Sequence, residues 1–165
     1  MSSLRNGVYC IRSHVTQSQS SGPLFVGIDT RPRREQRSGH IKEGTPIILV
    51  PKHKMARVEV QKIEGDNYRL SFLSHEASGM NLGCDKNNLQ KNNKVFVTKE
   101  EVEWALDKGN HEKSFHVQVR ESGMYMTVPE DAKENTQNVT FQLVLEQLQG
   151  EEGQEWEFIR IDREE

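Results

Sequence analysis

The stretch Met55–Leu73, MARVEVQKIEGDNYRLSFL, decides the fold class of this chain. Its first half alternates apolar and polar residues, which places Val58 and Val60 on the inward face of a β-strand. Gly65-Asp66-Asn67 is a turn signal, because these residue types accept the backbone angles of a tight turn. Tyr68–Leu73 then alternates again. The stretch therefore predicts two antiparallel strands joined by a tight turn.

Strand patterns fill most of the remaining sequence, and helix is nearly absent. The segment Val102–Leu106 is ambiguous, since Thr98 as N-cap and Glu101 also fit the capping box of a helix start. Strand and helix both stay open there. The other expected strands are short alternating or continuously apolar runs, at Gly7–Ser13, Pro23–Ile28, Pro46–Val50, Ser78–Gly83, Lys94–Thr98, Phe115–Arg120, Met124–Val128, Val139–Leu148 and Trp156–Asp162.

A repeat runs through these strands. Three segments share a plan of a turn and then an alternating strand with aromatic residues: GVYCIRS, DNYRLSFL and SFHVQVRES. Each block closes with another alternating strand, ARVEVQK, VEWALDK or EWEFIRI, and the closing strands lie roughly 46 to 54 residues apart. Three blocks of about 50 residues with four short strands each predict an all-β fold, the β-trefoil, in which three hairpins cap a six-stranded barrel. The alternative is an irregular β-sandwich or barrel without threefold symmetry.

Composition excludes several classes of function. The chain has 165 residues, which suits a single domain over residues 1–165. Its net charge of −3 argues against a binder of nucleic acid, which needs a broad basic face. No apolar run approaches the roughly 20 residues that span a bilayer, and the start MSSLRNGVYC has no signal peptide, so we expect a cytoplasmic protein and no membrane partner. Cys10 and Cys84 are then expected as two free thiols.

The sequence contains no signature of catalysis or of a cofactor. Its six histidines are scattered without metal-ligand spacing. There is no glycine-rich phosphate loop and no nucleophile elbow. We therefore expect a protein that is not an enzyme and that binds neither a metal nor another cofactor.

The most distinctive polar stretch is a run of arginines. Thr30–Gly39 reads TRPRREQRSG and contains Arg31, Arg33, Arg34 and Arg37 without one apolar residue. It lies between two apolar runs, PLFVGI and TPIILVP, that look like buried strands. A long basic loop held at both ends by a β scaffold is therefore expected.

Several short elements, in order along the chain, carry a resemblance to a known family. They are NGVYCIRS, FVGID, EQRSG, IILVP, MARVEVQKIEGDNYRL, YMTVPED and WEFIRID. Together they span nearly the whole chain, which resembles the cospin- and cnispin-like β-trefoil serine protease inhibitors of mushrooms. The resemblance implies that the loop after the second strand inhibits trypsin-like serine proteases. The family has an acidic residue before its Arg-Ser pair, whereas this chain has Gln36 before Arg37.

Three of the arginines are less suited to the specificity pocket of a trypsin-like protease. Such a pocket ends in a buried carboxylate, which a guanidinium satisfies by a bidentate hydrogen bond. Arg31 is followed by Pro32, whose ring obstructs attack at that bond. Arg34 is followed by Glu35, an acidic neighbour that these enzymes disfavour. Arg33 is followed by Arg34, which places two positive charges side by side.

Arg37 is the remaining and least obstructed choice, because small Ser38 and flexible Gly39 follow it. The bond Arg37–Ser38 is therefore the predicted reactive site. The hairpin Lys62–Asn67 lies where plant trefoil inhibitors carry their reactive loop, so Lys62 is a further candidate. The secondary candidates are Arg33, Arg34, Gln36, Gly39 and Lys62.

Two other functions stay open. One is inhibition of cysteine proteases, as in the mushroom mycocypins, which share the trefoil and a similar -EE carboxyl end. The other is carbohydrate binding, because Gln154-Glu155-Trp156 matches the Q-x-W motif of ricin-B-like lectins. The second closing strand has Trp104 without that Gln and the first has no Trp, so we expect Trp156 to be a barrel residue. The expected partner is a trypsin-like protease, bound by a monomer.

Overall fold

The computed structural model describes residues 4–13, 24–28, 43–51, 54–65, 67–73, 79–85, 87, 93–109, 113–128, 142–148 and 152–161. These ranges hold twelve strands and a 3-10 turn, η3 (Glu152–Gln154). The strands are β1 (Gly7–Ser13), β2 (Phe25–Ile28), β3 (Ile47–Val50), β4 (Val58–Glu64), β5 (Asn67–Phe72), β6 (Asn81–Gly83), β7 (Phe96–Thr98), β8 (Glu103–Lys108), β9 (Ser114–Val119), β10 (Met124–Thr127), β11 (Val144–Gln147) and β12 (Trp156–Arg160). No helix in the described ranges has the length and apolar character needed to cross a membrane.

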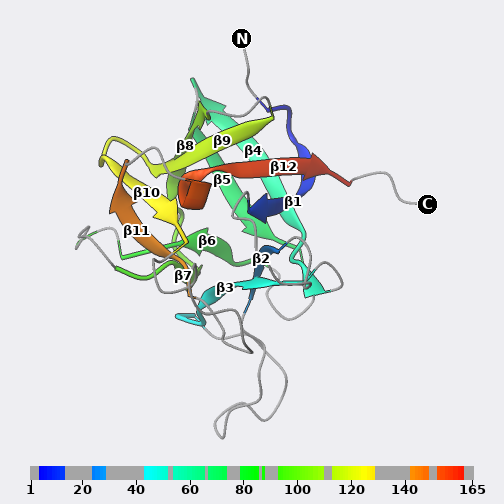
Figure 1. The fold of residues 1–165 in the computed structure, drawn as a ribbon, viewed down its shortest axis with the longest axis horizontal. Coiled ribbons are helices and arrows are strands. Elements are labelled where there is room, and N and C mark those ends of the chain that lie inside the picture. The colour runs from blue at the N-terminus through cyan, green and yellow to red at the C-terminus, as the bar shows by residue number, and fades with distance from the viewer. Residues whose placement is uncertain are drawn as a thin grey trace, which may run out of the picture.

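Six of the strands close into a barrel. Each neighbouring pair is antiparallel, in the cyclic order β1, β4, β5, β8, β9, β12 and back to β1. Closure leaves these strands without a free edge, which removes the usual template for edge-to-edge association. The hairpins β2–β3, β6–β7 and β10–β11 lie together at one end of this barrel (Figure 1). This architecture is the predicted β-trefoil.

The three hairpins meet in a cyclic set of backbone hydrogen bonds. The N–H of Ile47 donates to the carbonyl of Val95 at 3.1 Å, Val95 to Leu143 at 3.0 Å, and Leu143 back to Ile47 at 2.9 Å. All three side chains are fully buried. The ring marks the pseudo-threefold axis and satisfies backbone groups that burial would otherwise penalise.

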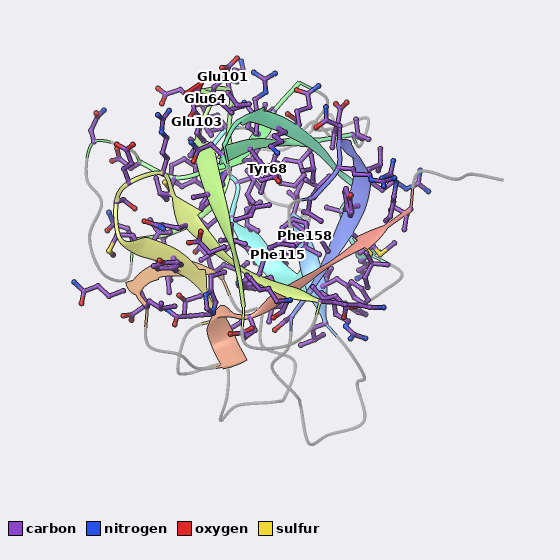
Figure 2. All side chains as sticks on the ribbon, turned by 90° about the horizontal axis from the view of Figure 1, so that it is seen from above. Glu64, Tyr68, Glu101, Glu103, Phe115 and Phe158 are labelled. Atoms are coloured by element: carbon purple, nitrogen blue, oxygen red, sulfur yellow. The ribbon has the colours of Figure 1, made fainter. Side chains whose placement is uncertain are left out.

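Threefold equivalence also appears in the barrel, through the residues that pair at matched positions. In each repeat an aromatic residue of the opening strand faces an apolar residue of the closing strand. These pairs are Tyr9 with Val58, Tyr68 with Trp104, and Phe115 with Trp156. Phe158 adds edge-to-face contacts with Tyr9 and Phe115 at 6.2 and 5.7 Å. Figure 2 shows Phe115 and Phe158 next to each other inside the barrel.

A second apolar cluster lies outside the barrel interior. Its buried members come from β1, β2 and β3: Cys10, Phe25, Ile48 and Val50. Cys84 belongs instead to the main core, and no disulfide joins it to Cys10. This arrangement agrees with the expectation of two separate thiols.

The predicted strands are confirmed within the described residues, most of them with somewhat different bounds, whereas the predicted parts at residues 23, 78, 139–141 and 162 lie outside the described residues. Gly7–Ser13 matches β1 at both ends. The ambiguous segment Val102–Leu106 is strand rather than helix, because β8 pairs with β5 on one side and β9 on the other. Thr98 is not a helix N-cap: it ends β7, and its Oγ1 accepts a hydrogen bond from the N–H of Glu100 at 3.0 Å, a side-chain turn.

Candidate functional site

The predicted reactive loop lies between β2 and β3. Residues 29–42, which include Arg33, Arg34, Gln36, Arg37, Ser38 and Gly39, are outside the described residues. The structure does describe both ends of this loop, at Ile28 and Glu43. The structure therefore shows how the scaffold holds the two ends of the loop.

The hairpin β2–β3 is buried on both faces. Every residue of the two strands is buried. One face, which includes Val26 and Leu49, packs in the main core, and the other face packs in the second apolar cluster. Gly27 is needed for this contact, because a Cβ there would come within 2.5 Å of Val50. In the other hairpins β11 ends in an exposed residue and β7 begins with a half-buried one, whereas neither strand of this hairpin contains either kind.

The outgoing end of the loop is tied to the next repeat through one carboxylate. Glu43 Oε2 accepts a hydrogen bond from Thr98 Oγ1 at 2.8 Å and one from the N–H of Lys99 at 3.3 Å. The hydrogen bond from Thr98, and then that from Lys99, hold the pKa of Glu43 below its ordinary value. Next in the chain, the N–H of Gly44 donates to the carbonyl of Val97 at 2.6 Å. We refer to Glu43, Gly44, Val97, Thr98 and Lys99 as the exit clamp.

Thr98 is held in place by its own neighbours. The residue is buried, and its methyl group lies over Gly83, where an added Cβ would approach Thr98 Cγ2 to 2.3 Å. The hydroxyl accepts from the N–H of Glu100 while it donates to Glu43. The donor of the exit clamp is therefore already oriented before any partner binds.

Lys62 lies at the other end of the barrel, near the start of β1. It is exposed, but its backbone is part of the ladder: it pairs with Tyr68, and its N–H donates to Asn6 Oδ1 at 2.8 Å. The register shifts between Lys62 and Glu64, and Ile63 is 44% exposed at this bulge. Glu64 lies at the molecular edge with two further carboxylates, Glu101 and Glu103 (Figure 2).

The Q-x-W motif is internal. Trp156 is fully buried, as predicted, and its indole N–H donates to the carbonyl of Met126 at 3.0 Å. Gln154 Nε2 donates to the carbonyl of Gln147 at 2.7 Å and to Thr127 Oγ1 at 3.3 Å. The motif thus holds β10, β11 and β12 together. Because the indole of Trp156 is fully buried, it presents no surface on which a sugar could stack.

A buried polar network that the sequence did not reveal surrounds the middle residue of this motif. Glu155 is 1% exposed and accepts from Ser114 Oγ at 2.5 Å, and its other oxygen lies 2.7 Å from His116 Nε2. Ser114 donates to the carboxylate and not to the imidazole, so this trio lacks the nucleophile–base contact of a hydrolase. The described residues contain no group of three His, Cys, Asp or Glu side chains that could hold a metal ion.

This chain is similar to known proteins in structure but not in sequence. No sequence profile of a known protein family matches it, and no curated protein sequence matches it. Among solved structures it is similar to the designed threefold-symmetric protein ThreeFoil, with 12% identity, a TM-score of 0.69, and coverage of 93% of this chain and 98% of that one. It is also similar to the ricin B-like lectin of Macrolepiota procera in complex with lactose, with 14% identity, a TM-score of 0.68, and coverage of 96% and 99%.

A third similar structure is a proteinase inhibitor from Coprinopsis cinerea, with 20% identity, a TM-score of 0.61, and coverage of 96% of this chain and 100% of that one. At these identities the matches show a β-trefoil fold. A designed protein, a lectin and an inhibitor share this fold, which is used for more than one kind of binding.

Proposed function

We propose that this protein inhibits trypsin-like serine proteases by binding them as a substrate does, with Arg37 in the specificity pocket. The observation that carries the proposal is the combination of an arginine-rich loop with the hairpin β2–β3, which is buried on both faces. The resemblance to mushroom inhibitors and the similarity to the Coprinopsis proteinase inhibitor support it.

The scaffold explains how a loop of this kind inhibits rather than being consumed. An extended loop binds the protease cleft through backbone hydrogen bonds on either side of the specificity side chain. Because both ends of the loop are fixed by packed strands, the conformational entropy that is lost on binding is reduced. If the bond Arg37–Ser38 is cut, the new ends stay near each other, and the reaction does not run on to product release.

Arg37 remains the primary candidate on chemical grounds. The guanidinium fits a buried carboxylate in a bidentate manner, and such an anchor would be the central hot spot of an interface of roughly 1,600 Å². Lys62 ranks below it, because a substrate-like segment needs free backbone groups, whereas the backbone of Lys62 is already engaged by Tyr68 and Asn6.

Carbohydrate binding is the second candidate function, supported by the structural similarity to the Macrolepiota lectin. The burial of Gln154, Glu155 and Trp156 disfavours it, because these side chains bond to the protein's own strands. A sugar site would need other residues.

An inhibition panel tests the proposal. Residual activity of trypsin, chymotrypsin and papain is measured with the wild-type protein, with R37A, and with the triple variant R33A/R34A/R37A, beside a glycan-binding screen. Inhibition of trypsin that is lost in R37A supports the proposal. Inhibition of papain alone, or trypsin inhibition that survives in the triple variant, contradicts it.

A further inference from the structure

The exit clamp connects the outgoing end of the loop to a strand of a different repeat. Glu43 belongs to the first repeat, whereas Thr98 ends β7, the third strand of the second repeat, and Lys99 follows it. The tie is therefore not part of the hairpin β2–β3. It joins the chain just after residue 42 to the adjacent hairpin β6–β7.

The clamp is built from both backbone and side-chain bonds. The N–H of Gly44 donates to the carbonyl of Val97 at 2.6 Å, and the N–H of Val97 donates to the carbonyl of Thr45 at 2.9 Å. Gly44 has a φ of +96°, a backbone angle that glycine adopts without strain. A turn at Gly44 thus directs Glu43 toward Thr98.

The carboxylate of Glu43 is exposed, but its hydrogen-bond donors are fixed. Thr98 is 2% exposed, and its hydroxyl is oriented by Glu100 and by the packing against Gly83. A charge-assisted bond to a donor that is already in position loses less entropy than a bond between two mobile surface groups. The geometry therefore distinguishes Glu43 from an ordinary surface carboxylate.

We propose that Glu43 is a positioning residue that keeps the outgoing segment in place after the loop is cut, so that the cleaved inhibitor remains bound and can be religated. This inference rests on the proposed function. In an inhibitor cut at Arg37–Ser38, the new amino end belongs to residues 38–42, which are continuous with Glu43. On the other side of the bond, the described chain ends at Ile28 in β2, whose residues are all buried. Religation reforms the same peptide bond with loss of one water, so no further reactant is needed.

The test measures retention of the cut loop. Wild type, E43A, T98V and T98S are mixed with trypsin at neutral pH, and cleavage after Arg37 and residual inhibition are followed over time by mass and activity. T98V is nearly isosteric but removes the hydroxyl, and T98S keeps it. E103A is the matched control, because Glu103 is another surface carboxylate with a hydrogen-bonded partner, Arg120 at 2.6 Å, in a different part of the barrel.

We expect cut protein to accumulate, and inhibition to decay, about tenfold faster in E43A and T98V, the change that loss of one charge-assisted hydrogen bond produces. T98S and E103A should behave as wild type, and the midpoint of thermal unfolding should move little in E43A. A merely structural role for Glu43 would lower thermal stability without changing the decay. Equal decay in wild type and E43A would overturn the inference.

A second experiment distinguishes a failure of the clamp from a failure of the proposed function. Amide hydrogen exchange of the free proteins is measured in peptides that cover residues 43–50 and 95–99. E43A should increase exchange at Gly44 and Val97, and E103A should not. If the wild type neither inhibits trypsin nor is cut, the proposed function fails, and the exchange result alone then shows whether the clamp holds this segment. Unchanged exchange in E43A would overturn the clamp.

Discussion

Trp104 and Trp156 make the same hydrogen bond in two repeats of the fold. The indole N–H of Trp104 donates to the carbonyl of Leu82 in β6 at 2.9 Å, and that of Trp156 donates to the carbonyl of Met126 in β10 at 3.0 Å. Each tryptophan thus joins the barrel to one cap hairpin. The equivalent bond of the first repeat is made by the backbone, where the N–H of Ala56 donates to the carbonyl of Val26 at 3.1 Å.

Replacement of either tryptophan by phenylalanine should destabilise the fold. The variants W104F and W156F each leave a buried carbonyl without its donor and a small cavity, so we expect each to lose about 3 kcal/mol of unfolding free energy. Chemical denaturation monitored by circular dichroism measures the loss. Because the two sites are equivalent, the two losses should agree within a factor of about two, and a loss below about 1 kcal/mol in either variant would contradict the role of the bond.

The buried carboxylate of Glu155 should be among the more sensitive polar positions. E155A removes the acceptor of Ser114 and the partner of His116, and loss of one partner from a buried charged network lowers the unfolding free energy by about 3 kcal/mol. The control is E157A, because Glu157 pairs with the partly exposed Arg12 and its loss should be below about 1 kcal/mol. Equal losses of unfolding free energy in E155A and E157A, measured by urea denaturation, would show that the burial of Glu155 adds no stability.

The turn between β9 and β10 contains a residue in a conformation that favours glycine. Glu121 has a φ of 57°, the only positive value at a non-glycine residue in the described ranges. Its ion pair with Arg120 is long, at 3.6 Å, and Glu121 is 79% exposed, so the side chain contributes little stability. We expect E121G to raise the unfolding free energy by about 0.5 to 1 kcal/mol, because the left-handed conformation strains a residue with a Cβ.

The matched control for that turn is Gly123, which has a φ of +74°. G123A puts a Cβ into the same unfavourable region and should lower stability, although no atom would obstruct it. Thermal melts of both variants provide the measurement. A lower melting temperature for E121G would show that the side chain of Glu121 contributes more than its strained backbone costs.

Sequence pattern predicted the strands well because alternation is a local property. Val58 and Val60 are fully buried as expected. The same alternation in β9 would turn Ser114 and His116 away from the core toward solvent, yet both are buried, because Glu155 arrives from a distant part of the chain and covers them. No local rule contains that contact.

The site was less predictable than the fold. The exit clamp depends on Glu43 meeting Thr98 across two repeats, a proximity that only the closed trefoil creates. The β-bulge between Lys62 and Glu64 also escaped the pattern, and Lys62 is exposed although strict alternation would place it on the same inward face as Val60. The arginines that suggested the function lie within residues 29–42, and their roles stay predictions.

The exit clamp should persist to acidic pH and then be lost. The pKa of Glu43 is lowered from the ordinary value of 4.5, chiefly by the hydrogen bond from Thr98. A carboxyl whose folded pKa is depressed contributes stability that is present above its unfolded pKa and is lost as the pH falls through its folded pKa. An NMR titration of the Gly44 amide should therefore show a midpoint below 4.5.

The variant E43Q provides the control for this titration. Its amide cannot ionise in this range, so the transition of the Gly44 resonance should disappear. A transition that persists in E43Q would assign the titration to another carboxyl. A midpoint at or above 4.5 in the wild type would show that the bonds of the clamp do not form in solution.

Substitution of Arg37, the proposed primary specificity residue, should change which protease is inhibited while the scaffold stays unchanged. A trypsin-like pocket rewards a cation that reaches its buried carboxylate, whereas a chymotrypsin-like pocket is a hydrophobic slot. R37K should keep trypsin inhibition, since lysine also carries a cation, with some loss because it lacks the bidentate geometry. R37F should lose trypsin inhibition by about a thousandfold, as expected for a hot-spot anchor, and gain inhibition of chymotrypsin. Because these substitutions leave every described strand of the scaffold unchanged, the melting temperatures of the variants should match that of the wild type. If R33F redirects the inhibitor and R37F does not, the reactive bond follows Arg33 instead.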